Sequence, residues 1–254
     1  MAGPSGKGEI GTPDTLGRPR ATWRVEVDPS VPEDFGKDLE EGASREKALR
    51  WDEAAAMYER LLRGLGPIDG GDLHGRAIRA TLLLRRANAL MELQQWAEAR
   101  EALDDALHDA KASAQEDVIA QALLASGVYA ANTGDLARGE AFMMQALERF
   151  HRRDDRSSLQ GRGWTFLNLA SLYGKTGRLD LAFVTFTKAQ DVLGGAKNWA
   201  GVAAAWEAQA QLRRAIHDED RWREDLAEAV LFYDREGMTA KADRLRALLG
   251  NKRV

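Results

Sequence analysis

The chain has 254 residues, of which 44% are hydrophobic and 30% charged, and its formal net charge is -4. These proportions are typical of a globular protein of one or two domains, and the small negative charge argues against general affinity for nucleic acids or membrane surfaces. Because the sequence contains no cysteine, disulfides, thiolate metal sites and a cysteine nucleophile are excluded. No signal core or membrane-length apolar segment occurs, so we expect a cytoplasmic protein without membrane insertion.

Residues 1–33 differ in composition from the rest of the chain. They are rich in Gly, Pro, Ser and Thr, and such a segment buries too little apolar surface to offset the entropy of ordering it. We therefore predict a flexible N-terminal arm. Within it, Trp23, Val25 and Val27 alternate with polar residues, the pattern of an extended segment with one apolar edge. The arm either stays mobile or docks through these three side chains on its own body or on a partner.

From residue 34 to residue 250 the pattern is helical and repeats. Sets of three residues, most of them small, recur along the chain with the same spacing inside each set. Successive sets begin 40 to 45 residues apart. A larger residue stands at one position of the first and of the last set. The sets are Gly42, Ala54 and Leu61; Ala87, Ala99 and Ala106; Gly127, Gly139 and Ala146; Ala170, Ala182 and Ala189; and Ala210, Trp222 and Ala229.

Each set indicates two helices joined by a short turn. The small residues in facing positions let the two helices approach closely. In the turns "NTGDL" and "KTGRL", Gly134 and Gly177 favour a left-handed helix end, and Asp135 can cap the next helix. After the fifth pair, residues 239–249 predict one more amphipathic helix that covers the last pair. Its Ala242, Leu245, Leu248 and Leu249 would face the pair, while Lys241, Asp243, Arg244 and Arg246 would face water.

The pattern resembles the tetratricopeptide repeat, most closely in "FLNLASLYGKTGRLDLAFVTFTKA". That segment matches through Phe166, Leu169, Ala170, Tyr173, Ala182, Phe186 and Ala189. The longer spacing is similar to the long-helix variants of bacterial regulators and kinesin light chains. The resemblance implies an all-α fold, a right-handed α-solenoid of about five antiparallel helix pairs with a C-terminal capping helix. The repeat domain would span residues 34–250, between the arm at 1–33 and a tail at 251–254.

Candidate catalytic motifs fail on spacing. Gly174-Lys175-Thr176 looks like the end of a phosphate-binding loop, but that loop needs a glycine where Leu169 stands. We predict instead that the tripeptide ends a helix. The run His217–Asp220 is interpreted as a solvated cap of the following helix, with metal binding as the alternative. No nucleophile elbow occurs. We therefore predict no catalytic residue, no metal, no cofactor and no enzyme activity.

The remaining function is surface recognition, for which the first helix of each pair would line a concave groove. Helical spacing nominates eight groove residues. Asparagine is a poor residue inside helices, and its amide can pair with the backbone of an extended peptide, the use that the resemblance also implies. Asn132 has an alternative role as a helix cap, and three cations would receive carboxylates. The eight residues are Arg85, Asn88, Asn132, Trp164, Asn168, Lys175, Gln211 and Arg214.

The sequence thus predicts a non-catalytic adaptor that binds a protein or peptide segment and does not contact nucleic acid directly. The alternative is a ligand-responsive regulatory module that binds a signalling peptide and acts through a partner or by self-association as a homo-oligomer. In a third hypothesis the N-terminal arm, anchored by Trp23, occupies the groove or links protomers.

Overall fold

A computed structural model describes residues 33–250, and over this range the chain forms helices connected by turns. The predicted arm, with Trp23, Val25 and Val27, and the tail at 251–254 lie outside the described residues. The helices are α1 (Glu33–Lys47), α2 (Trp51–Gly64), α3 (Leu73–Glu92), α4 (Trp96–Ser113), α5 (Glu116–Asn132), α6 (Leu136–Phe150), α7 (Arg156–Lys175), α8 (Leu179–Gly195), α9 (Trp199–Ala215), α10 (Glu219–Arg235) and α11 (Thr239–Gly250).

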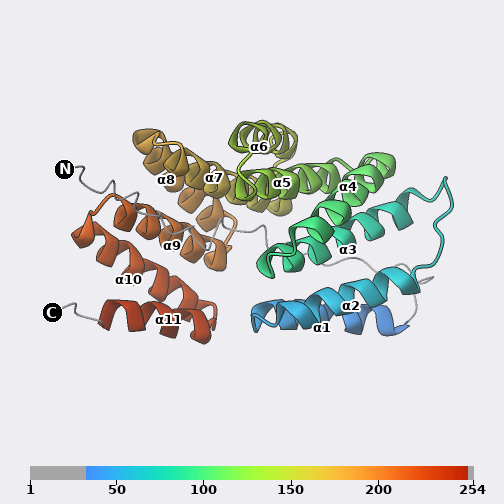
Figure 1. Cartoon of the computed structure of the whole chain (residues 1–254), viewed down its shortest axis with the longest axis horizontal. Helices are drawn as coiled ribbons and strands as arrows, with labels where there is room; N and C mark the ends of the chain where they lie inside the picture. Colours follow the sequence, from blue (N-terminus) through green and yellow to red (C-terminus); the bar gives the residue numbers. More distant parts are fainter. Residues whose placement is uncertain (1–32, 251–254) are drawn as a thin grey trace, which may run out of the picture.

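The helices are arranged as five antiparallel pairs followed by one further helix. Each odd-numbered helix from α1 to α9 packs on the even-numbered helix that follows it, and α11 packs on α10. The pairs follow an arch, with α1 and α2 at one end and α11 at the other (Figure 1). The predicted all-α solenoid of five pairs with a final helix is confirmed.

Small residues allow the helices of a pair to approach closely, as the sequence predicts. In the central pair, a Cβ added to Gly127 would lie 3.0 Å from the backbone oxygen of Gly139 and 2.9 Å from Cγ of Met143. A Cβ added to Gly139 would likewise lie 3.0 Å from the backbone oxygen of Gly127. In two other pairs alanines take these positions, and all four are fully buried. They are Ala87, Ala99, Ala170 and Ala182.

The turns use left-handed backbone conformations to end one helix and begin the next. Gly134 and Gly177 have φ values of 96° and 75°, as predicted, and Asp135 caps α6 by accepting a hydrogen bond of 3.1 Å from the Arg138 N–H. At other turns a residue with a side chain adopts the same conformation, at a cost of about 1 kcal/mol each. These residues are Leu49, Gln94, Ala114, Lys197 and His217.

The buried apolar side chains form two clusters. The larger one runs from Phe35 to Ala208 and joins the first four pairs to one face of α9. The smaller one joins the other face of α9 to α10 and α11. It consists of Ala203, Ala210, Trp222, Leu226, Ala229, Tyr233, Ala242 and Leu245. Trp222, which replaces the alanine of the repeat, is therefore a core residue at the solenoid's end.

The final helix α11 covers the last pair, but one of its predicted orientations is wrong. Ala242 and Leu245 are buried as expected, whereas Leu248 is 38% exposed. Arg244 is exposed as expected, and its Nη2 also lies 2.6 Å from Oε1 of the buried Glu207. The ion pair crosses from α11 to α9. Helix periodicity alone did not indicate it, because the partner belongs to another element.

Candidate functional site

Helices α3, α5, α7 and α9 form a continuous inner row. α3 packs directly on α5, α5 on α7 and α7 on α9, in addition to the contacts within each pair. Comparable contacts do not link α4, α6, α8 and α10 to one another. In the middle of the arch the row therefore lies on the inner side, and α4, α6 and α8 lie on the outer side (Figure 1).

Five of the eight predicted groove residues are accessible to solvent. Asn88 on α3, Asn132 at the end of α5 and Gln211 on α9 are half-buried, and Lys175 and Arg214 are exposed. The guanidinium of Arg214 lies 5.3 Å from the ring centroid of Trp222, so α10 is one of its neighbours. All five side chains keep part of their surface exposed, although Oδ1 of Asn88 is itself buried.

Arg85, in contrast, belongs to a buried polar network between the first two pairs. Its Nη1 lies 3.3 Å from Oε2 of Glu46 and 3.3 Å from the hydroxyl of Tyr58, which donates a 2.8 Å hydrogen bond to Glu46. Burial raises the pKa of Tyr58 above its ordinary range, so the hydroxyl stays protonated. Arg85 therefore connects α3 to α1 and α2, and its charge is already matched by Glu46.

Trp164 and Asn168 also lie in the interior, with 3% and 0% of their surfaces exposed. The Asn168 side-chain amide donates a 2.8 Å hydrogen bond to the backbone oxygen of Trp164, one turn earlier on α7. Among the described residues, neither Nε1 of Trp164 nor Oδ1 of Asn168 has a hydrogen-bond partner. A direct ligand contact at these two residues would require their side chains to move.

The segment "YGKTGR" forms the end of α7 and the turn into α8, as predicted. The Thr176 hydroxyl donates to the backbone oxygen of Leu172 at 3.1 Å, so it caps the helix. Arg178 makes two hydrogen bonds of 3.0 and 2.7 Å to the carboxylate of Glu140 on α6 and stacks 4.4 Å from the ring centroid of Tyr173. Hydrogen bonding to Arg178 lowers the pKa of Glu140. In the segment "YGKTGR", Lys175 is the charged residue that takes part in none of these contacts.

Lys175 combines accessibility with partial desolvation. Its side chain is exposed, yet the surrounding protein lowers the pKa of its ammonium group. No carboxylate among the described residues forms an ion pair with it. An unpaired, partly desolvated cation is stabilised by a ligand carboxylate more than a fully hydrated one would be, because part of its hydration is already lost.

The lowered Lys175 pKa gives an expected titration. At a pH below the Lys175 pKa of both the folded and the unfolded chain, the ammonium group is charged in both states. As pH rises, the folded protein releases this proton first, so the free energy of unfolding increases through that interval. After reductive 13C-methylation, the Lys175 signal should titrate at lower pH in the folded than in the urea-unfolded chain. Lys175→Gln assigns the signal, and Lys188→Gln, on the exposed side of α8, is the control. A folded midpoint at or above the unfolded one contradicts the expectation.

The run His217–Asp220 stands at the start of α10. The prediction that its side chains cap this helix is wrong. Asp218 stands at the N-cap position without a side-chain capping bond, because its carboxylate pairs with Nη1 of Arg213 at 2.8 Å. Within residues 33–250 no three His, Asp or Glu side chains come together as ligands of a metal ion. No helix in this range is both long and apolar enough to cross a membrane.

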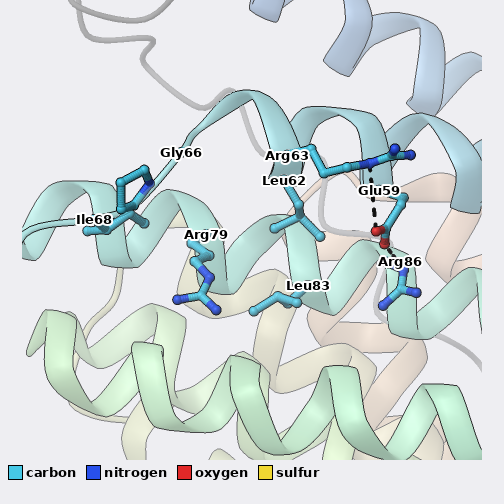
Figure 2. A pocket seen from close by; sticks show the side chains of 9 residues that line it. Glu59, Leu62, Arg63, Gly66, Ile68, Arg79, Leu83 and Arg86 are labelled. Atoms are coloured by element: carbon cyan, nitrogen blue, oxygen red, sulfur yellow. Dashed lines mark ion pairs between the residues drawn. The ribbon is translucent and has the colours of Figure 1, made fainter.

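A cleft between α2, the following loop and α3 was not indicated by the sequence analysis. It has a volume of about 380 Å³, and Figure 2 shows its lining side chains. Leu62 and Leu83 contribute apolar surface from the two helices, and the loop adds Pro67 and Ile68. The polar lining is Glu59, Arg63, Arg79 and Arg86. The sequence signal was the long connection "LGPIDGGD" between two helices, which separates their ends and leaves the cleft open.

The arginines at this cleft outnumber the carboxylates that they contact. Glu59 is shared by Arg86, at 2.8 Å, and Arg63, at 3.9 Å. The buried Asp109 of α4 is shared by Arg76, at 3.0 Å, and Arg79, at 3.4 Å. Among the residues that line the cleft itself, three arginines accompany one glutamate, so the lining carries an excess of positive charge.

The fold and the inner row together define a helical-repeat solenoid, a class that commonly serves as a scaffold or binding surface. The sequence matches no family model and no curated protein. Among solved structures, the chain is similar to BtubC (BKLC) from P. vanneervenii, with a TM-score of 0.54 and 18% sequence identity. The match covers 84% of this chain and 80% of that chain. At this identity the likeness shows a shared fold.

Proposed function

We propose that the protein is a non-catalytic adaptor of the tetratricopeptide-repeat type, which binds an extended peptide or protein segment along the inner row of α3, α5, α7 and α9. The observation that carries the proposal is Lys175, a solvent-accessible cation on α7 that is partly desolvated and has no ion-pair partner among the described residues. A carboxylate of the ligand, from an acidic side chain or a chain terminus, would pair with it. The cysteine-free composition supports a cytoplasmic location for this activity.

Half-buried amides on either side of Lys175 support a peptide ligand. Gln211 on α9 carries both a donor and an acceptor, as the backbone of an extended segment requires, whereas Oδ1 of Asn88 on α3 is buried and a ligand would meet the rest of that side chain. The buried Arg85, Trp164 and Asn168 are assigned a supporting role, because they hold the inner helices in place. The ligand would therefore contact fewer residues than the helical spacing nominated.

The proposal is tested by selecting peptides from a random displayed library on the full chain and measuring their affinity for variants. We expect the selected peptides to be acidic, and we expect Lys175→Gln and Asn88→Ala each to weaken binding by about tenfold, or 1.4 kcal/mol. Lys188→Gln removes the same charge from the outer helix α8 and should leave the affinity unchanged. Peptides that bind all variants equally would show that the inner row is not the binding surface.

A further inference from the structure

The cleft between α2 and α3 lies on a different surface from the inner row. With about 100° of rotation per residue, Arg79 and Arg86 point to the side of α3 opposite Asn88. Both line the cleft together with Leu83, and Glu59 of α2 lies between Arg86 and Arg63 (Figure 2). A ligand in the cleft would therefore leave Asn88 and Lys175 untouched.

The charges of the cleft favour an anionic ligand. Arg63 and Arg79 keep 73% and 42% of their side-chain surface exposed, so their guanidinium groups can reach a ligand. Each shares its carboxylate with a second arginine. The acidic residues of the neighbouring loop are engaged locally: Asp69 accepts from the Gly71 N–H at 3.3 Å and Asp72 from the Gly75 N–H at 2.8 Å. Planar guanidinium groups bind carboxylates through paired hydrogen bonds.

The apolar lining of the cleft indicates that the anionic ligand also carries an apolar group. Leu62 and Leu83 lie between Arg79 and the other arginines and offer a surface for an aliphatic side chain, and Ile68 lies beyond Arg79 (Figure 2). A nucleic acid would place phosphates at the arginines but would leave this apolar surface without an apolar partner. The chain's net charge of -4 also disfavours a long polyanion.

We propose that this cleft is a second binding site, which takes an acidic peptide segment with an aliphatic side chain between its carboxylates. The aliphatic side chain lies on Leu62 and Leu83, and the flanking carboxylates pair with Arg63 and Arg79. Arg86 stays with Glu59, which fixes the wall of the cleft. The junction of the first two helix pairs thereby recognises a ligand independently of the inner row.

The test is fluorescence anisotropy on the full chain with the labelled peptide Glu-Asp-Leu-Glu-Glu-Leu-Asp-Glu. Charge reversal in Arg63→Glu/Arg79→Glu should weaken binding by at least about tenfold, because the salt-dependent attraction becomes repulsion. Arg100→Glu/Arg221→Glu changes the net charge equally on exposed surfaces of α4 and α10 and should change affinity by less than about twofold. A peptide with both leucines replaced by serine should bind about tenfold more weakly, since no aliphatic side chain remains to be buried in the cleft.

Three results would overturn the proposal: equal binding by the cleft and control variants, equal binding of the leucine and serine peptides, or tighter binding of a ten-nucleotide uridine RNA than of the peptide. If the double glutamate variant unfolds, Arg63→Gln/Arg79→Gln must still weaken binding more than Arg100→Gln/Arg221→Gln. With Lys175→Gln as the background, which removes the inner-row contribution, Arg63→Glu/Arg79→Glu must still weaken binding more than Arg100→Glu/Arg221→Glu does. If Lys175→Gln abolishes that difference, the peptide is assigned to the inner row and not to the cleft.

Discussion

Gly127→Val should separate the central helix pair and destabilise the protein by about 3 kcal/mol, at the upper end of the cost of overpacking a core. A single Cβ at this position already meets the backbone of Gly139 at 3.0 Å and Met143 at 2.9 Å, and valine adds two methyl groups. Because the nearest oxygen belongs to the backbone of α6, a side-chain rotation cannot relieve the contact. Hydrogen exchange measured by mass spectrometry should show faster exchange in α5 and α6 than in the wild type.

Gly195→Val is the matched control for this substitution. Gly195 ends α8, and an added Cβ has no atom within 4 Å. Valine there should change the free energy of unfolding by no more than about 0.5 kcal/mol, as for other exposed substitutions. Equal effects of the two substitutions would show that α5 and α6 do not depend on the close approach of their glycines.

Arg244→Ala should release α11 from the last pair. The Glu207 carboxylate is 2% exposed and has two partners, Arg244 at 2.6 Å and the Tyr233 hydroxyl at 2.7 Å. Removing one partner of a buried ion pair leaves a buried charge, and because Arg244 itself is half-exposed, we expect a cost of about 2 kcal/mol. α11 packs mainly on α10, and this ion pair ties it to α9, so the loss is confined to the C-terminal end of the described residues. Amide exchange in α11 should accelerate by about 30-fold, the equivalent of that cost.

Arg246→Ala provides the comparison on the same helix. Arg246 pairs with Asp234 and Asp243, and all three side chains are substantially exposed. Exposed pairs contribute about 0.5 kcal/mol, so exchange in α11 should change by less than about threefold. If Arg246→Ala frees α11 as much as Arg244→Ala does, the burial of Glu207 is not what holds the helix.

The solenoid could be predicted because its signals are local. The spacing from Ala87 to Ala99, or from Gly127 to Gly139, depends only on helix and turn geometry within one pair, and the structure confirms it. Gly134 and Gly177 similarly identify their turns without knowledge of the rest of the fold. Five pairs and a final helix follow from repetition of these signals along the chain.

The candidate site was predicted less completely, because exposure depends on how one pair stacks on the next. Helical spacing placed Asn168 and Lys175 on one face of α7, but the curvature of the solenoid buries the first and exposes the second. The burial of Arg85 could not be predicted for the same reason, since its partner Glu46 belongs to the preceding pair. The cleft at Arg63 and Arg79 requires two helices and a loop together, and no single segment carries its pattern.

The division of the core into two clusters also makes the C-terminal end of the described residues a separable unit. The larger cluster connects the first four pairs to α9, whereas the other face of α9, α10 and α11 share the smaller one. Detachment of α10 and α11 would therefore break the smaller cluster and leave most of the larger one in place, with α9 as the boundary between the two.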